Sequence, residues 1–247
     1  MPPDLPTATV LPGTLARPDP LALSFGGFTA ESFDALGRLR ERPNVEQYRA
    51  DKAALDVHVW APFRAYRDDL AVNLVLPNRL PWETERNVFS RLLKNDFGAG
   101  GSHHHVWMSF YRTGRKRLTD PQLSHSIDPD GFAVGLYAGD HAGDYLARIK
   151  ARALAEPEVF GALLRGALAD PAWRAFAYTG TGANEVRHDL AAGDPDAALV
   201  KRMRGVWVRR TFARADVLAW GPDLVRHSFG AVDHLWPLYR LFADATA

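Results

Sequence analysis

The segment 103–111, HHHVWMSFY, constrains the fold most, because apolar and polar side chains alternate along it. Successive side chains of a β-strand point to opposite faces of the sheet, so Val106, Met108 and Phe110 would share one face. Three apolar side chains on one face favour burial of that face. The opposite face would carry His105, Trp107, Ser109 and Tyr111.

Two more short strands are predicted directly after this one. QLSHSID (122–128) and GFAVGLYA (131–138) are joined by DPDG, which is a strong turn signal. The three segments together predict an antiparallel meander, and GVWVRRTF (205–212) predicts a fourth strand.

Helical spacing of apolar residues covers most of the remaining chain. Thr29 and Asn44 are typical N-cap residues, and Pro237 is expected to kink or interrupt the last helix. The predicted helices span 30–40, 45–56, 63–76, 142–156, 158–170, 196–204 and 221–242.

These elements predict one α+β domain over residues 21–247. We expect an antiparallel sheet of about four or more strands, packed with N-terminal helices, mid-chain helices and a C-terminal helix. The Pro-rich residues 1–20 are predicted to form a flexible, extended arm.

Composition excludes several kinds of site. The chain has 247 residues, no cysteine and a formal charge of +1. The lack of cysteine excludes disulfides, thiolate metal sites and cysteine nucleophiles, and it favours a cytoplasmic protein. A near-neutral chain has no global field that attracts nucleic acid, so any such attraction must be local. No segment is long and apolar enough for a membrane span, so no membrane partner is expected.

The histidine run 103–105 raises the possibility of a metal site. His103 and His105 would share a strand face, but metal sites usually need three or four ligands with an ordered second shell. No HExxH-type spacing supports a partner, so an exposed loop entering a strand is the simpler interpretation, and no metal or other cofactor is predicted. In an enzyme, His105 would be the general base or a metal ligand, with Asp96 or Asp120 as its partner.

Basic residues crowd two places in the chain. The first is the predicted hairpin loop after residue 111, and the second surrounds the fourth strand, where Trp207 and Phe212 interleave with the cations. Basic groups beside aromatic rings suit phosphates and stacked bases. The alternative is that the cations are separately solvated or paired with acids.

The second face of the meander is unusually rich in rings, hydroxyls and an amide. Such a mixture often binds polar ligands, and Gly135 would leave room for close approach. The alternative is that a helix covers this face. His125 falls on the core side, where a structural role is expected. TGTGAN (179–184) resembles a phosphate loop, but it lacks the GxxxxGK[ST] pattern and follows no clear strand.

Several segments resemble a family of conserved bacterial proteins, domain of unknown function 2461. The resemblance covers about 28–242 and lies in FTAESFDALGRLR, in VEQYRADKAALDVHVWAPFRAYRDDL, in LSHSIDPDGFAVGLYAG, in DYLARIKARALAEPEVFGALL and in the stretch 199–242. The chain departs from the family's Arg-Asp-x-Arg-Phe-Ser-x-Asp-Lys motif, where it reads ERNVFSRLLKNDFGAGGSHHH. The resemblance implies an α+β fold and a soluble bacterial protein, but no reaction.

Three functions are therefore compared. The leading hypothesis is a binding module for an anionic ligand, a nucleotide or nucleic acid. The second is an enzyme, such as a metal-dependent hydrolase, with its pocket on the polar face of the sheet. The third is a structural or protein-interaction domain. The predicted ligand-binding residues are Trp107, Tyr111, Arg112, Lys116, Arg117, Gln122, Tyr137, Arg209 and Arg210.

Overall fold

The computed structural model describes residues 10–94, 99–139, 145–190 and 195–245 of the chain. Over these residues it contains a seven-stranded sheet in the order β1-β2-β3-β4-β7-β5-β6, and all neighbouring strands are antiparallel. The strands are β1 (Trp82–Glu83), β2 (Val106–Arg112), β3 (Gln122–Asp128), β4 (Gly131–Gly139), β5 (Trp173–Thr179), β6 (Val186–Asp189) and β7 (Gly205–Ala213).

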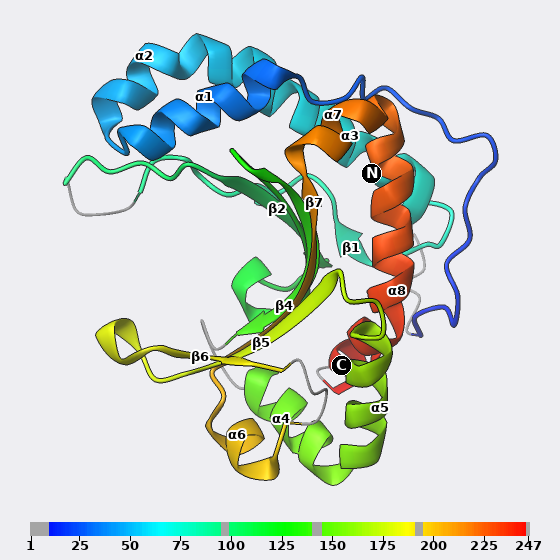
Figure 1. Ribbon diagram of the computed structural model, residues 1–247. Coiled ribbons are helices and arrows are strands. Elements are labelled where there is room, and N and C mark those ends of the chain that lie inside the picture. Colours follow the sequence, from blue (N-terminus) through cyan, green and yellow to red (C-terminus); the bar gives the residue numbers. More distant parts are fainter. Residues whose placement is uncertain (1–9, 95–98, 140–144, 191–194, 246–247) are drawn as a thin grey trace.

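Helices pack at both ends of this sheet and on one of its faces, which confirms the predicted α+β class. Figure 1 shows α1 to α3 at one end of the sheet and α4 to α6 at the other, while α8 runs along one face. The helices are α1 (Ala30–Glu41), α2 (Val45–Leu55), α3 (Ala61–Leu70), α4 (Tyr145–Ala155), α5 (Pro157–Ala167), α6 (Ala197–Arg202), α7 (Arg214–Trp220) and α8 (Leu224–Ala245). None of the helices in the described part of the chain combines the length and apolar character needed to cross a bilayer.

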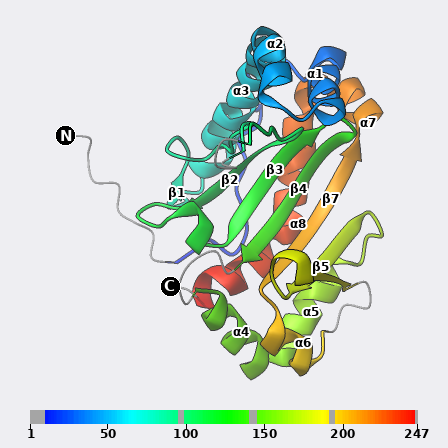
Figure 2. The same cartoon turned by 90° about the vertical axis from the view of Figure 1, so that its left-hand side faces the viewer.

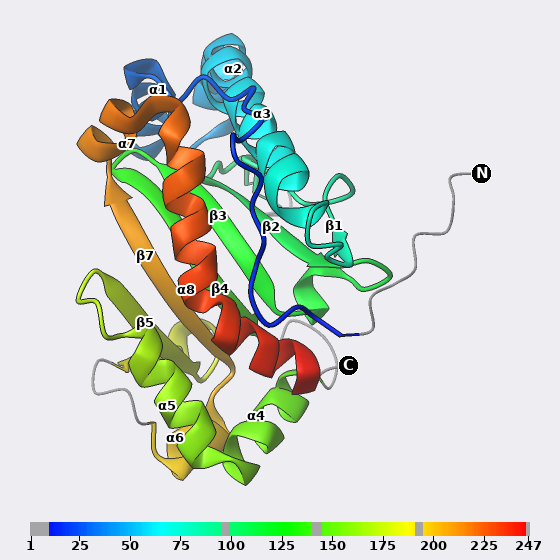
Figure 3. The ribbon, with the colours of Figure 1, turned by 90° about the vertical axis from the view of Figure 1, so that its right-hand side faces the viewer.

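The meander β2-β3-β4 has the predicted register and the predicted buried face. Met108 pairs with His125, which pairs with Val134, so these three residues share one side of the sheet. This side packs under α8 and α3 (Figure 3) and belongs to a single hydrophobic core. The buried apolar side chains of this face are Val106, Met108, Phe110, Leu123, Ile127, Phe132, Val134 and Leu136.

The two strands β5 and β6 were not expected from the sequence. β7 was predicted as the fourth strand, and it pairs with β4 along its whole length, but its second edge pairs with β5. β5 buries Trp173, Ala175 and Ala177, which give a weak apolar signal because two of the three are alanines. β6 is mostly exposed, so its sequence VRHD has no hydrophobic pattern to reveal it.

The helical segment that begins at Val45 continues through Pro62. A π-helical turn, η1 (Asp56–Trp60), joins α2 to α3, and a second one, η2 (Ala71–Val75), extends α3. Proline lacks the N–H that a regular helix requires, and the wide turn before it accommodates this loss. At the start of this segment, the Asn44 side chain accepts a hydrogen bond from Gln47 N, as its N-cap assignment predicts. α8 likewise continues through Pro237, and Figure 3 shows that it changes direction toward its C-terminal end.

The described part of the Pro-rich arm, residues 10–20, lies against the helices. Pro12 O accepts a hydrogen bond from Trp236 Nε1 of α8, and Ala16 N donates to Asn78 Oδ1. Just beyond the arm, the buried carboxylate of Asp69 accepts hydrogen bonds from the backbone of Ser24 and Phe25. These contacts attach residues 10–20 to α8 and to the turn after η2, and attach the residues that follow them to α3.

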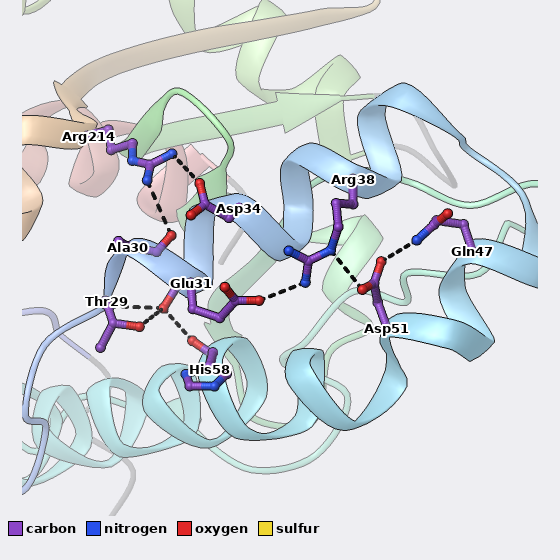
Figure 4. A network of polar contacts seen from close by, with 10 residues as sticks. Thr29, Ala30, Glu31, Asp34, Arg38, Gln47, Asp51, His58 and Arg214 are labelled. Atoms are coloured by element: carbon purple, nitrogen blue, oxygen red, sulfur yellow. Dashed lines mark hydrogen bonds and ion pairs between the residues drawn. The ribbon is translucent and has the colours of Figure 1, made fainter.

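Polar contacts connect the helices at the α1 end of the sheet. Figure 4 shows the Arg38 guanidinium between Glu31 and Asp51, at 2.7 Å and 2.8 Å. Arg214, at the start of α7, bonds the Asp34 carboxylate of α1 at 2.8 Å. The sequence analysis did not predict α7. The contact between Arg214 and Asp34 links it to α1 at this end of the sheet.

Candidate functional site

The second face of the sheet carries a grid of aromatic and polar side chains. Figure 2 shows this open face with α1 and α2 at one end and α4 and α6 at the other. Cross-strand pairing places Tyr137 of β4 beside Trp207 of β7, and Trp207 beside Phe176 of β5. Paired residues face the same side, so the three rings belong to one surface. The meander part of this face has the composition that the sequence predicted, and none of the α-helices in the described segments lies over it (Figure 2).

A pocket of about 410 Å³ lies on this open face. Its size falls within the usual range of small-molecule sites. It brings together four of the predicted ligand-binding residues, Trp107, Gln122, Tyr137 and Arg209. The other lining residues are His104, His105, Leu118, Ser124, Ser126, Asp128 and Trp207.

Two glycines let aromatic rings lie close to the sheet. A Cβ on Gly135 would come within 2.7 Å of Trp207 Nε1 and 2.8 Å of Val208 O. A Cβ on Gly139 would overlap the ring of Tyr137. The missing side chains therefore make space for the floor of the pocket, which agrees with the prediction made for Gly135.

Two arginines of the open face lie over tryptophan rings. The guanidinium carbon of Arg117 is 4.4 Å from the Trp107 ring centroid, and that of Arg209 is 4.6 Å from the Trp207 centroid. Arg117 also donates to Phe89 O at 2.7 Å. Neither arginine forms an ion pair with a described carboxylate. Burial lowers the pKa of Arg117, but a guanidinium remains charged at neutral pH.

Two nitrogen donors of the pocket lining have no hydrogen-bond partner among the described atoms. These are Gln122 Nε2 and Trp207 Nε1, both buried. The Gln122 amide oxygen is already used, because it accepts from Ser109 Oγ at 3.2 Å. A buried donor without an acceptor costs free energy. Trp207 Nε1 lies against Gly135 in the floor of the pocket, so of the two donors only Gln122 Nε2 is not already accounted for by this packing.

The structure does not bring the other predicted cations to this site. Arg112 points to the α8 side, where its Nε bonds Asp120 Oδ1 at 2.9 Å and its Nη1 bonds Ala243 O. Arg210 follows Arg209 on β7, so it faces the opposite side, and it pairs with Asp170 at 3.0 Å. Lys116 is exposed in the hairpin loop and does not line the pocket. Of the basic residues predicted to bind a ligand together, some therefore lie on the open face and others lie elsewhere. Strand alternation and pairing with acids separate them.

Tyr111 lies on the open-face side of β2 but is covered. Its side chain is 4% exposed, and its hydroxyl donates to Arg86 O at 2.7 Å. Tyr111 does not line the pocket.

The three neighbouring histidines do not form a metal site with other described residues. No group of three or more His, Asp or Glu side chains in the described part of the chain could hold a metal ion, and this includes His103 and His105. Burial lowers the pKa of both His103 and His105. Asp120, the candidate partner of His105, is fully buried and bonded to Arg112, while Asp96 lies outside the described residues.

His125 has the structural position that the sequence predicted. It is fully buried on the α8 side, and its Nδ1 lies 2.8 Å from the Tyr66 hydroxyl. Tyr66 in turn donates to Ser228 Oγ of α8 at 2.6 Å. His125 therefore connects the sheet to α3 and α8, away from the pocket.

A second pocket, of about 420 Å³, adjoins the first and shares Tyr137 and Trp207 with it. Its outer wall is the TGTGAN loop, which does follow a strand, β5, contrary to the expectation from sequence. Gly180 and Gly182 have φ values of +73° and +55°, which the loop needs and which glycine adopts readily. The remaining lining residues are Tyr178, Thr181, Glu185, Arg204 and Gly205.

Sequence reasoning missed Phe176, Tyr178 and Arg187 of the open face. The alternation of Arg174, Phe176 and Tyr178 within WRAFAYT was the available signal. It could not be used because the strand itself was not predicted.

The sequence matches none of the protein-family models and none of the curated proteins with which it was compared. The resemblance to domain of unknown function 2461 therefore remains a prediction.

Proposed function

We propose that this protein is a binding module for a small anionic ligand that contains an aromatic ring, such as a nucleotide. The observation that carries the proposal is the position of two arginines beside the tryptophans of one pocket. Arg209 lines the pocket and lies over the ring of Trp207, while Arg117 lies outside the lining but over the ring of Trp107, which lines it. Aromatic faces stack on planar bases, and unpaired arginines bind phosphate. We place the protein in the cytoplasm because the chain contains no cysteine.

The polar side chains of the pocket support an oxygen-rich ligand. Arg209 and the Ser126 hydroxyl line it and can donate, and Gln122 Nε2 has no acceptor among the described atoms. Asp128 is the one carboxylate among the lining residues of this pocket, and its Oδ1 already accepts from the backbone of Asp130. The pocket therefore offers more donors than acceptors, which suits an anion.

Calorimetric titration with adenosine and uridine monophosphates tests this function. We expect binding that weakens as salt increases, since phosphate contacts release counterions. Arg117→Glu and Arg209→Glu should each lower the affinity about tenfold or more and flatten the salt dependence.

Arg210→Gln is the matched control, because Arg210 is the next residue on the same strand and faces the other side. It should bind like the wild type. If neither monophosphate binds, or if Arg210→Gln weakens binding as much as Arg209→Glu, the proposal fails.

The enzyme hypothesis has weaker support. His105 does line the pocket, but none of the hydrogen bonds given for the described residues joins it to a carboxylate. A general base needs a partner that holds its ring and proton in place. We therefore propose no reaction.

A further inference from the structure

We propose that the open face binds a single-stranded nucleic acid, with successive bases in the two adjoining pockets. This inference rests on the proposed function of the first pocket and extends it from one nucleotide to a strand. The geometry that carries it is the continuity of the two pockets across Tyr137 and Trp207, from β2 to the loop after β5.

The second pocket has the chemistry of a base site rather than a phosphate site. Tyr178 and Tyr137 supply rings, and both are only partly buried. Burial raises the pKa of Tyr178, so its hydroxyl remains a hydrogen-bond donor at neutral pH. Glu185 lines the same pocket and supplies an acceptor for the edge of a base. A second phosphate would be repelled by Glu185, whereas a neutral base would not.

Cations and rings alternate across the strands beside both pockets. The guanidinium carbon of Arg187 lies 4.4 Å from the Phe176 centroid, and that of Arg209 lies 6.0 Å from it. Arg209 also covers Trp207, and at the far side Arg117 covers Trp107. This row extends from the β2 side of the open face to β6. A charged backbone that crosses these strands would meet a guanidinium near β2, on β7 and on β6.

The acids of the open face lie beside this row. Asp128 lies at the end of β3, Asp189 lies on β6 opposite Phe176, and Glu185 lies in the second pocket. Arg117, Arg187 and Arg209 form no ion pair with a described carboxylate. These three guanidiniums are therefore held by aromatic rings rather than by the acids of the same face.

The open face lies between two elements that project from the sheet. Figure 1 shows the β5-β6 hairpin projecting on the side opposite to α8, as α1 and α2 do at the other end. The two adjoining pockets on this face suit bases that are exposed, as in a single strand. A duplex, with its bases stacked inside, would not present them to Trp207 and Tyr178.

Fluorescence anisotropy with labelled oligouridylate and oligothymidylate of about eight nucleotides tests the proposal, since single-strand sites of this type cover about 4–16 nucleotides. We expect the oligonucleotide to bind at least tenfold more tightly than uridine monophosphate. Tyr178→Ala should weaken oligonucleotide binding about fivefold or more but leave monophosphate binding unchanged. Arg187→Gln should lower the slope of affinity against salt by about 0.7.

Tyr48→Ala is the control, because Tyr48 is a partly buried tyrosine on α2, outside both pockets. It should bind both ligands normally. Tyr178→Leu serves as a second variant if Tyr178→Ala does not fold. Competition with duplex of the same sequence should require at least tenfold more competitor than the single strand.

The outcomes separate this inference from the function on which it rests. If the oligonucleotide binds no more tightly than the monophosphate, or if Tyr178→Ala and Tyr178→Leu bind it normally, the strand proposal is wrong and the nucleotide site stands. If neither ligand binds, the proposed function fails as well. If polyglutamate binds as tightly as the oligonucleotide, the surface recognises charge alone, which also overturns the proposal. Comparison of oligouridylate with oligodeoxyuridylate, which differ only in the 2′-hydroxyl, then distinguishes RNA from DNA.

Discussion

Arg209 lies over the indole of Trp207, two residues earlier on the same strand, with its guanidinium carbon 4.6 Å from the ring centroid. Arg210, the next residue, points to the opposite face and pairs with Asp170. Strand alternation thus gives two adjacent arginines different surroundings. Arg209 remains available to an anionic ligand, while Arg210 is already paired.

Replacement of Gly135 should disturb the floor of the pocket. An alanine Cβ would contact Trp207 Nε1 at 2.7 Å and Val208 O at 2.8 Å, and the backbone oxygen cannot move freely. We expect Gly135→Ala to lower the free energy of unfolding by about 1–3 kcal/mol and to shift the tryptophan emission. Urea unfolding followed by fluorescence measures both.

Gly37→Ala is the matched control for Gly135. Gly37 lies within α1, where a new Cβ would meet nothing within 4 Å. Alanine is favoured over glycine in a helix by about 1 kcal/mol, so this variant should be as stable as the wild type or more stable. A Gly135→Ala protein with wild-type stability would show that Trp207 does not need this space.

Stability should decrease below neutral pH because of His125. Burial lowers the pKa of His125 to about 3, whereas the unfolded side chain has a pKa of about 6.5. Among the described residues, the titratable group that His125 contacts by a hydrogen bond is Tyr66. Burial raises the pKa of Tyr66, so this hydroxyl stays neutral and does not stabilise a protonated His125. Between these two pKa values the unfolded state binds the proton and the folded state does not. Acidification therefore destabilises the fold by about 1.4 kcal/mol per pH unit.

Urea unfolding at pH 7 and pH 5 checks this dependence. Over this interval the wild type should lose about 2 kcal/mol through His125 alone. The free energy of unfolding of His125→Leu should decrease by about 2 kcal/mol less than that of the wild type over the same interval. His125→Asn replaces this variant if His125→Leu does not fold. Equal losses in the wild type and the variants would show that His125 accepts a proton in the folded state.

Removal of the Asp120 carboxylate should be strongly destabilising. Asp120 is fully buried, and its two oxygens bond the backbone N–H and the guanidinium of Arg112. Asp120→Asn leaves the Arg112 charge without its partner, so we expect a loss of about 3–5 kcal/mol in the free energy of unfolding.

Asp170→Asn is the control, because Asp170 pairs with Arg210 where both side chains are more than a third exposed. That pair should contribute about 0–1 kcal/mol. Chemical unfolding of the two variants measures the difference. A loss below about 1 kcal/mol for Asp120→Asn would contradict the structural role given to this pair.

The Asp69 carboxylate should hold the segment before α1 in place. It accepts hydrogen bonds from Ser24 N at 2.8 Å, from Ser24 Oγ at 2.8 Å and from Phe25 N at 2.9 Å. Asp69→Ala removes these acceptors, so amide hydrogen exchange at Ser24 and Phe25 should become at least tenfold faster. Mass spectrometry of peptic peptides measures this change. Exchange at His125 and its neighbours on β3 should change less, and a uniform increase would indicate global destabilisation instead.

Local patterns were sufficient to predict the meander. The alternation of Val106, Met108 and Phe110 identified both a strand and its buried face, because the side-chain period of a strand is two whatever the rest of the fold. The turn between Asp128 and Gly131 predicted that the strands on either side of it, β3 and β4, pair antiparallel. The same reasoning placed Trp107, Gln122 and Tyr137 on the second face, where they line the pocket.

Other features depended on contacts between distant parts of the chain. β5 and β6 are strands because β7 pairs with β5, and no periodicity in VRHD predicts this. Arg117 and Arg112 lie five residues apart in the same basic cluster, but only the folded chain shows that one contacts Trp107 and the other Asp120.

The sequence by itself therefore determined the class of fold, the meander and the face on which a site would lie. The tertiary structure decided which cations reach that face, that Trp207 and Tyr178 belong to it, and that the TGTGAN loop borders it. The physical reason is the range of the interactions. Side-chain alternation and turn preference act over a few residues, whereas ion pairing, burial and strand order depend on residues that only folding brings together.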